Sequence, residues 1–249
     1  MTNKPQIDTS IKAAARNYTA CNSRKIEYII IHGTGHVAPT KNYALGLKNN
    51  QCTGSFHYVV GEGKIYKCID HHNIAWHIGN PNNVYKVKMS KPKNSNSIGI
   101  EMSELNEKTG EVADSTIELT GQLVRYLMDL LDIPESRVLR HYDVLSKPCP
   151  TGFLTDTKWK KLKKLLVDPV EEIKNNVDYN KKVIVNCNDT LNVRDKRPTN
   201  NKLGNKIDEL KNKTEALLGY VYDDWGSIYY IKDNEYRHGF VNVKYLELV

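Results

Sequence analysis

The sequence lacks the long apolar segments that a membrane-spanning or exported chain carries. In its 249 residues no apolar run approaches the ~18 residues of a membrane span. The first ten residues contain none of the apolar stretch of a secretory signal. We therefore expect a soluble chain that does not insert into a membrane and is not exported by that route.

Cysteine is scarce and odd in number. The five cysteines are widely scattered, which speaks against a disulfide framework and favours free thiols or a metal ligand. Internal repeats and low-complexity tracts are also missing. A hydrophobic content of 39% is enough for packed cores, which speaks against disorder and against a coiled rod.

The charge is moderately basic. Lysine and arginine number 36 against 29 acidic residues, a net charge of +7, and the excess lies within residues 1–167. Such a charge suits nucleic acid, an anionic membrane or an anionic polymer, and the total alone does not decide between them.

Hydrophobic patterning predicts an α/β domain over residues 1–167, a mixed β-sheet flanked by helices. A nearly continuous apolar, β-branched run at 25–31 indicates a central strand, and a Gly-Glu-Gly turn between 55–60 and 64–69 indicates a hairpin. Further strands are expected at 97–102 and 138–141. Helices are expected from a capping box at Ser115 to a point before Pro134, and over 155–167.

The pattern changes at residue 168. Residues 168–180 are polar and acidic, which indicates a linker. Short β-rich runs separated by turn residues follow in 181–249, and these predict a small all-β barrel. The runs are expected at 182–186, 191–194, 216–222, 228–231 and 239–243.

Three candidate metal ligands stand where strands are expected to end. They are His32, His141 and Cys149. Two imidazoles and a thiolate suit Zn²⁺, and three protein ligands leave the fourth position for water. No short spacing rule connects these residues, and a lone histidine or cysteine at a strand end is more often structural.

Five segments come in an order that matches a known family. They are Ile-Ile-Ile-His32-Gly-Thr-Gly, Ser-Phe-His57-Tyr-Val-Val, Ala-Trp-His77-Ile-Gly, Asn-Ser-Ile-Gly-Ile-Glu101 and His141-Tyr-Asp-Val-Leu-Ser-Lys-Pro-Cys149-Pro. Together, over roughly residues 20–165, they resemble the zinc-dependent N-acetylmuramoyl-L-alanine amidases of the phage-lysozyme and peptidoglycan-recognition-protein type. The resemblance implies that His32, His141 and Cys149 bind zinc. It also implies that the substrate amide joins the lactyl group of N-acetylmuramic acid to L-alanine.

Glu101 is the predicted general base. Strand alternation puts Ile98 and Ile100 on one face and Gly99 and Glu101 on the other. A glutamate facing the zinc can take a proton from the attacking water and deliver it to the leaving nitrogen. The alternative is a solvated carboxylate at a strand end.

Lys147 is the second predicted catalytic residue. In an extended Lys-Pro-Cys segment its side chain points to the same side as Cys149. A fixed ammonium there could stabilise the oxyanion of the reacting carbonyl. The alternative is one more surface lysine in a lysine-rich chain.

The family pattern also suggests a substrate groove. It implies that His57, Trp76 and His77 line this groove or support the site, with half-buried packing as the alternative. One departure is Phe56, which stands where many relatives have a tyrosine. Because phenylalanine cannot transfer a proton, Glu101 and Lys147 must carry more of the chemistry.

The C-terminal part resembles a second family. Thr190-Leu-Asn-Val-Arg194-Asp and Gly239-Phe-Val-Asn-Val are similar to bacterial SH3-like cell-wall-binding domains, over about residues 181–249. Such a module would keep an attached enzyme on its insoluble polymer.

The leading hypothesis is a peptidoglycan hydrolase of the phage endolysin type, held in the host cytoplasm until it is released to the cell wall. Three alternatives remain: a host autolysin with the same chemistry, a non-catalytic peptidoglycan-binding protein with a structural zinc, and a cysteine peptidase or acyltransferase with Cys149 as nucleophile. A nucleic-acid partner is not expected, since no basic helix or stacking motif accompanies the charge. The host species, the ligand of the C-terminal module and the oligomeric state stay open.

Overall fold

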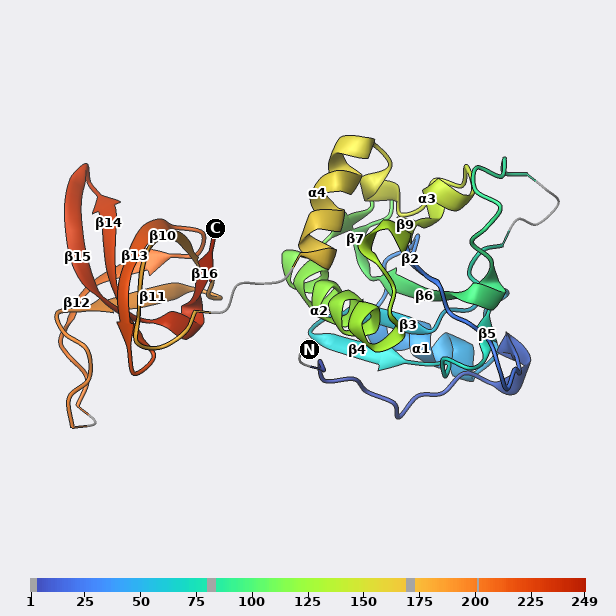
Figure 1. Cartoon of the computed structure of the whole chain (residues 1–249), viewed down its shortest axis with the longest axis horizontal. Helices are drawn as coiled ribbons and strands as arrows, with labels where there is room; N and C mark the ends of the chain where they lie inside the picture. Colours follow the sequence, from blue (N-terminus) through green and yellow to red (C-terminus); the bar gives the residue numbers. More distant parts are fainter. Residues whose placement is uncertain (1–3, 80–83, 169–172, 201) are drawn as a thin grey trace. The chain divides into compact units, whose positions relative to one another are not determined.

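The computed structural model describes residues 4–79, 84–168, 173–200 and 202–249. The chain forms two compact units, Met1–Pro169 and Val170–Val249 (Figure 1). Residues 169–172 of the predicted linker lie outside the described residues. The first strand of the second unit, β10, begins at Val177, inside the segment predicted as linker.

Among the described residues, the first unit contains a five-stranded mixed sheet in the order β4-β3-β6-β2-β9. Strand β2 (Tyr28–Gly33) pairs in parallel with β6 (Ser97–Met102) and β9 (Val138–Arg140). Strand β3 (Tyr58–Gly61) is parallel to β6, and β4 (Lys64–Lys67) closes the predicted hairpin antiparallel to β3. The predicted mixed α/β sheet is confirmed.

Helices cover both faces of this sheet. Helices α2 (Asp114–Leu131) and α4 (Asp156–Val167) pack on one face over a core that includes Ile29, Ile31 and Leu123 (Figure 1). Helix α1 (Thr40–Lys48), which we did not predict, packs on β3 from the other side. The predicted capping box is wrong, because α2 begins at Asp114 and its N-cap is Ala113.

Shorter elements connect these layers. They are α3 (His141–Val144), the paired strands β1 (Tyr18–Thr19) and β5 (Ile74–Ala75), the paired strands β7 (Glu104–Asn106) and β8 (Glu111–Val112), and 3-10 turns at Ala15–Asn17, Asn94–Asn96, Glu135–Arg137 and Thr151–Phe153.

The second unit is a curled all-β sheet. Its described strands follow the order β12-β11-β15-β14-β13-β10-β16. Alternate side chains of β13 and β14 enter a core with Val183, Leu218 and Ile228. All five predicted strands are present, whereas β12 and β16 were not predicted. The elements are β10 (Val177–Val185), β11 (Thr190–Arg194), β12 (Lys206–Lys211), β13 (Glu215–Tyr222), β14 (Trp225–Lys232), β15 (Glu235–Asn242), a 3-10 turn (Val243–Tyr245) and β16 (Leu246–Leu248).

A buried carboxylate network joins three strands of this second unit. The Asp208 carboxylate accepts hydrogen bonds from the Tyr230 hydroxyl at 2.9 Å, from Arg237 Nη1 at 3.2 Å and from Lys232 Nζ. Burial opposes ionisation of Asp208, but the hydrogen bonds from Lys232, the Glu209 N–H and Tyr230, together with the Lys232 charge, outweigh it and lower its pKa to about 2.

Replacing Asp208 with asparagine should therefore lower the free energy of unfolding of the second unit at pH 7 by about 1 kcal/mol, allowing for partial screening by water. The carboxylate stabilises the fold above the unfolded-state pKa of about 3.9. This stabilisation is lost as the pH falls through the folded-state pKa of about 2, so the two proteins should converge there. Urea unfolding followed by Trp225 fluorescence, with Trp76 and Trp159 replaced by phenylalanine, measures it. A difference that does not change with pH would contradict the assignment.

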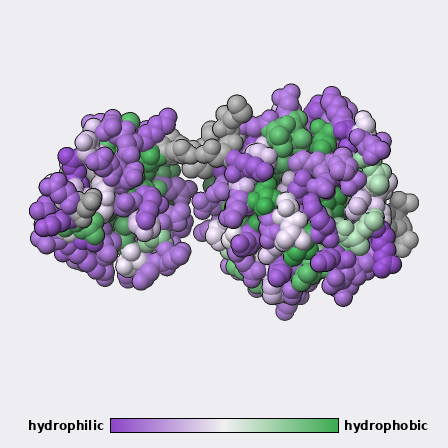
Figure 2. All heavy atoms as spheres, turned by 90° about the horizontal axis from the view of Figure 1, so that it is seen from below, coloured by the Kyte–Doolittle hydropathy of each residue, from purple (hydrophilic) through white to green (hydrophobic). Residues whose placement is uncertain are grey.

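The surfaces of both units are mainly polar on the side drawn in Figure 2, where apolar residues form separate areas among hydrophilic ones. No helix among the described residues is long and apolar enough to cross a membrane.

Candidate active site

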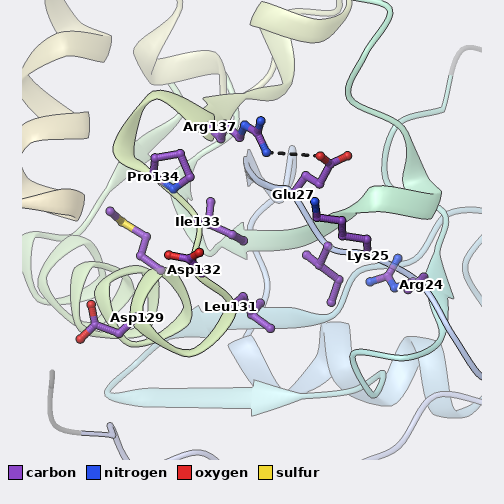
Figure 3. A pocket seen from close by; sticks show the side chains of 11 residues that line it. Arg24, Lys25, Glu27, Asp129, Leu131, Asp132, Ile133, Pro134 and Arg137 are labelled. Atoms are coloured by element: carbon purple, nitrogen blue, oxygen red, sulfur yellow. Dashed lines mark hydrogen bonds and ion pairs between the residues drawn. The ribbon is translucent and has the colours of Figure 1, made fainter.

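Two clefts in the described part of the first unit are candidates for a functional site. One, of about 1080 Å³, lies between the segment before β2 and the end of α2 (Figure 3). It carries charges of both signs, and Arg137 Nη1 pairs with Glu27 Oε1 at 3.3 Å. Among the described residues, the buried polar atoms without a hydrogen-bond partner lie elsewhere. The unpaired buried polar atoms therefore point to the second cleft as the candidate active site.

The second cleft, of about 770 Å³, opens at the carboxyl end of β2. Crevices at the carboxyl ends of parallel strands are the usual ligand sites of α/β sheets. The structure brings most of the predicted site residues together here. Those lining the cleft are His32, Trp76, His77, Glu101, Lys147 and Cys149.

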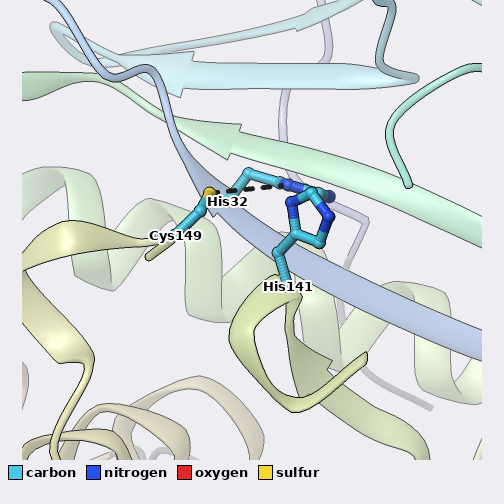
Figure 4. A group of neighbouring side chains, drawn as sticks. All are labelled: His32, His141 and Cys149. Carbon is cyan, nitrogen blue, oxygen red and sulfur yellow. Dashed lines mark hydrogen bonds between the residues drawn. The ribbon is translucent and has the colours of Figure 1, made fainter. Parts of the chain in front are cut away.

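The three candidate metal ligands form one cluster. His32 lies near the end of β2, His141 begins α3 directly after β9, and Cys149 lies in the loop that follows α3. Their ligand atoms lie within 4.8 Å of one another, and Cys149 Sγ is 3.7 Å from His32 Nδ1 (Figure 4). Zn–N and Zn–S bonds of about 2.0 and 2.3 Å at a tetrahedral angle would place such atoms about 3.5 Å apart. The observed distance fits.

His141 gives a second indication of a bound ion. Within the described residues, its Nδ1 and Nε2 are both buried and without a hydrogen-bond partner. Leaving a buried polar atom unpaired costs about 1–3 kcal/mol, so the site is incomplete as a purely protein structure. Two imidazoles and a thiol are donors that zinc prefers. The residues present therefore fit zinc.

Burial sets the protonation of this cluster. Desolvation lowers the pKa of His141 to about 4 and that of His32 well below its usual value, so both rings are neutral and keep a lone pair. Desolvation, with the Glu101 charge adding to it, raises the pKa of the Cys149 thiol to about 12. A metal ion must therefore displace the thiol proton as it binds.

Arg140 connects the segments that carry His141 and Cys149. Its buried guanidinium donates from Nη1 to the carbonyls of Phe153 at 2.8 Å and Leu154 at 2.7 Å, and from Nε to Asp143 at 2.8 Å. These bonds tie the start of α3, where His141 stands, to the chain just beyond Cys149.

The predicted extended shape of the Lys-Pro-Cys segment is wrong. The Cys149 N–H donates to the Lys147 carbonyl at 2.8 Å, which makes a three-residue turn. Lys147 nevertheless lines the same cleft as Cys149.

Glu101 stands where strand alternation places it. In the β2–β6 register it is the direct partner of His32, while Ile98 and Ile100 enter the core on the opposite face. Its Oε2 is buried without a partner among the described residues. Burial raises the pKa of Glu101 to about 8, the Lys147 charge works against this rise and Glu104 adds to it. The carboxyl group is therefore poised to exchange a proton near neutral pH.

His57 does not reach the cleft. It is fully buried, its Nδ1 accepts the Gly99 N–H at 3.0 Å, and its Nε2 lies 3.2 Å from the Asn73 carbonyl. The Arg24 guanidinium, which can only donate, lies 3.0 Å from the same Nε2. The prediction that His57 contacts substrate does not agree with this geometry, because its ring atoms are used in joining β6 to a neighbouring loop.

The other two predicted groove residues differ from each other. Trp76 is 37% exposed, lines the cleft and donates from Nε1 to Thr19 Oγ1 at 3.0 Å. His77 is only 7% exposed, and both ring nitrogens contact protein atoms. Trp76 is available to a ligand, whereas His77 mainly faces its own fold.

Sequence reasoning missed Glu104 and Tyr43. Glu104 is 2% exposed, its Oε2 accepts the Gly35 N–H at 3.0 Å, and its Oε1 is unpaired among the described residues. An acidic residue directly after a buried strand was the available signal. Tyr43 lines the cleft from α1, and its hydroxyl donates to the His36 carbonyl.

Two imidazoles and a thiol beside a buried carboxylate, at a cleft of an α/β sheet, are typical of metal-dependent hydrolases. The family model for N-acetylmuramoyl-L-alanine amidase matches residues 22–152, just over half of the 249 residues. The chain belongs to this family.

Individual relatives agree with this assignment. The N-acetylmuramoyl-L-alanine amidase CwlA of Bacillus subtilis (strain 168) is 32% identical over 143 residues, which are 57% of this chain and 49% of that protein. A probable N-acetylmuramoyl-L-alanine amidase of Bacillus licheniformis is 32% identical over 102 residues, 41% of this chain and 28% of that protein. The chain thus spans half or less of these relatives' lengths. The solved structure of a mutant endolysin from Bacillus subtilis matches with a TM-score of 0.52 and 27% identity, covering 67% of this chain and 99% of that one.

Proposed function

We propose that the protein is a zinc-dependent N-acetylmuramoyl-L-alanine amidase that hydrolyses the bond between N-acetylmuramic acid and L-alanine in bacterial peptidoglycan. The observation that carries the proposal is the cluster of His32, His141 and Cys149, in which the buried His141 imidazole is unpaired among the described residues. His32 and Cys149 line the same cleft as Glu101. Membership in the amidase family supports the choice of substrate.

Each group has a distinct part in this reaction. When bound by His32, His141 and Cys149, zinc supplies a Lewis acid and lowers the pKa of water at the site. Glu101 takes a proton from the attacking water and passes it to the leaving alanine nitrogen. Its burial favours the protonated form, which helps it to hold the proton between these two steps.

Lys147 and the cleft wall complete the proposed mechanism. The Lys147 ammonium stabilises negative charge that develops on the substrate carbonyl oxygen. Phe56 also lines the cleft and cannot donate a proton, so proton transfer falls to Glu101. The exposed face of Trp76 offers an apolar surface for the glycan or the stem peptide.

Purified cell walls test the proposal. The zinc-loaded protein should release new N-terminal alanine amines, detected by amine labelling, and should lose this activity on chelation and regain it with Zn²⁺. The absence of new alanine amines at any enzyme concentration would favour a non-catalytic wall-binding protein. Full activity after complete metal removal would instead favour Cys149 as a nucleophile.

We further propose that residues 181–249 form an SH3-like module that binds the cell wall. Because β10 begins at Val177, a clean truncation has to remove residues 170–249. The truncated enzyme should cleave a small soluble muropeptide within about two-fold of the full-length rate, but should need on the order of 10-fold more protein to clear intact walls. Sedimentation with walls and turbidity assays measure the two effects. Adding the second unit as a separate chain is the control, and it should not restore clearance.

The endolysin type is the biological setting that we favour, in which the enzyme acts from the host cytoplasm once it is released to the wall. The likeness to the mutant endolysin from Bacillus subtilis supports it. A host autolysin is the alternative, and expression timed to phage lysis would separate the two.

A further inference from the structure

We propose that His77 is a positioning residue that fixes the tautomer and orientation of His32, so that Nδ1 of His32 is left free to bind the metal ion. A chain of buried hydrogen bonds runs from the Lys93 carbonyl through Ser97 and His77 to His32. The inference rests on the proposed zinc site, but it does not depend on the identity of the substrate.

The first link determines which nitrogen of His77 carries a proton. Ser97 is fully buried on β6, and its hydroxyl donates to the Lys93 carbonyl at 2.6 Å. The hydroxyl has one hydrogen, so toward His77 its oxygen can only accept. His77 Nε2, 3.1 Å away, is therefore the donor, and Nδ1 of the same ring is left as an acceptor.

The second hydrogen bond determines which nitrogen of His32 carries a proton. His77 Nδ1 lies 3.1 Å from His32 Nε2, and both side chains are buried. An acceptor on His77 requires the proton of His32 to be on Nε2. His32 Nδ1 then has a free lone pair, and this is the atom that faces Cys149 Sγ at 3.7 Å. Partners of this kind orient metal-binding histidines and raise their basicity.

The backbone around His77 holds its ring in this position. The Asn94 carboxamide oxygen accepts the N–H groups of His77 at 3.1 Å and Ile78 at 2.8 Å. A Cβ at Gly99 would lie 2.5 Å from His77 Cγ, so the ring packs directly on the glycine backbone. The glycine in the Ile-Gly-Ile strand is therefore explained by the space that His77 needs.

Zinc affinity of the full-length apoprotein, measured by competition with a chromophoric chelator, tests the proposal. His77→Ala should weaken zinc binding about 10–100-fold. His77→Asn should recover most of this loss, because its amide oxygen can take the place of Nδ1 as acceptor. His72→Ala removes an exposed histidine that takes no part in the hydrogen bonds between Lys93, Ser97, His77 and His32. This variant should bind zinc like the native protein.

Nitrogen-15 NMR of the histidine rings gives a readout that needs neither metal nor substrate. In the zinc-free native protein His32 should be a single tautomer protonated at Nε2, and in His77→Ala it should be a mixture. A native His32 protonated at Nδ1 would overturn the proposal. Native zinc affinity in His77→Ala would also overturn it. So would an equal loss of zinc affinity in His77→Ala and His77→Asn, provided that the two variants have the same melting temperature in chelator.

Ser97→Ala keeps the test decisive if His77→Ala does not fold. Removing the hydroxyl frees the orientation of His77, so zinc affinity should fall by a smaller factor and the His32 tautomers should mix. Unchanged zinc affinity and a single His32 tautomer in Ser97→Ala would contradict the proposal that hydrogen bonds through Ser97 and His77 fix the tautomer of His32. A native protein that binds zinc but releases no alanine amine from walls would count against the proposed function, and the inference that His77 positions His32 would still hold.

Discussion

Replacing Cys149 with serine is expected to remove tight zinc binding and to lower wall cleavage on the order of 100-fold or more. A serine hydroxyl does not ionise near neutral pH, so the site loses its one anionic ligand and keeps only two imidazoles. Metal analysis of the dialysed protein and alanine-amine release from walls measure the two effects on one sample.

Cys21→Ser is the matched control for this experiment. Cys21 is not among the residues that line the cleft, and its thiol donates to the Ser23 carbonyl at 3.3 Å, so zinc content and rate should both stay at the native level. A Cys149→Ser protein that retains stoichiometric zinc would show that the thiol is not a ligand.

Replacing Glu101 with glutamine is expected to keep zinc bound while lowering turnover about 10²–10⁴-fold, the usual contribution of a general acid–base group. The amide has nearly the shape of the carboxylate but cannot accept and return a proton. Glu111→Gln, an exposed acid on β8, is the control. A Glu101→Gln enzyme with a near-native rate would make the assignment of the base wrong.

Replacing Glu101 with glutamine, which lowers turnover, should raise the thermal stability of the zinc-free protein at high pH. Because burial raises the folded-state pKa of Glu101 to about 8, its contribution to stability is present below the unfolded-state pKa of about 4.3 and is lost as the pH rises through 8. The zinc-free Glu101→Gln protein should therefore be more stable than the native apoprotein at pH 8 and not at pH 4. Thermal unfolding in chelator at the two pH values measures this difference.

The sheet was predictable because its strands are short apolar runs with β-branched residues. The run before His32 and the Ile-Gly-Ile segment of β6 indicate strands, and their apolar residues indicate which face of each strand enters the core. Helix α1 and strand β12 were missed for the opposite reason. Helix α1 is short, contains Gly46 and has no side-chain N-cap, and β12 has only two apolar residues among charged ones, so contacts made elsewhere in the fold decide their structure.

The metal cluster could be predicted only by resemblance. His32 and His141 meet because β2 and β9 pair in parallel, and no spacing along the chain expresses that pairing. His57 and His77 sit in similar motifs, yet His57 contacts Arg24 and nearby backbone groups, whereas His77 contacts the candidate metal ligand His32. That difference arises from the packing of loops on β6, which the sequence pattern does not report.

Hydrolysis of a defined muropeptide in ¹⁸O-labelled water tests the central claim most directly. We expect the zinc-loaded enzyme to place one labelled oxygen in the lactyl carboxylate of N-acetylmuramic acid and to release a stem peptide with a free, unlabelled L-alanine terminus. The chelated enzyme should do neither. Label in a stem-peptide carboxylate or at a sugar reducing end would contradict it.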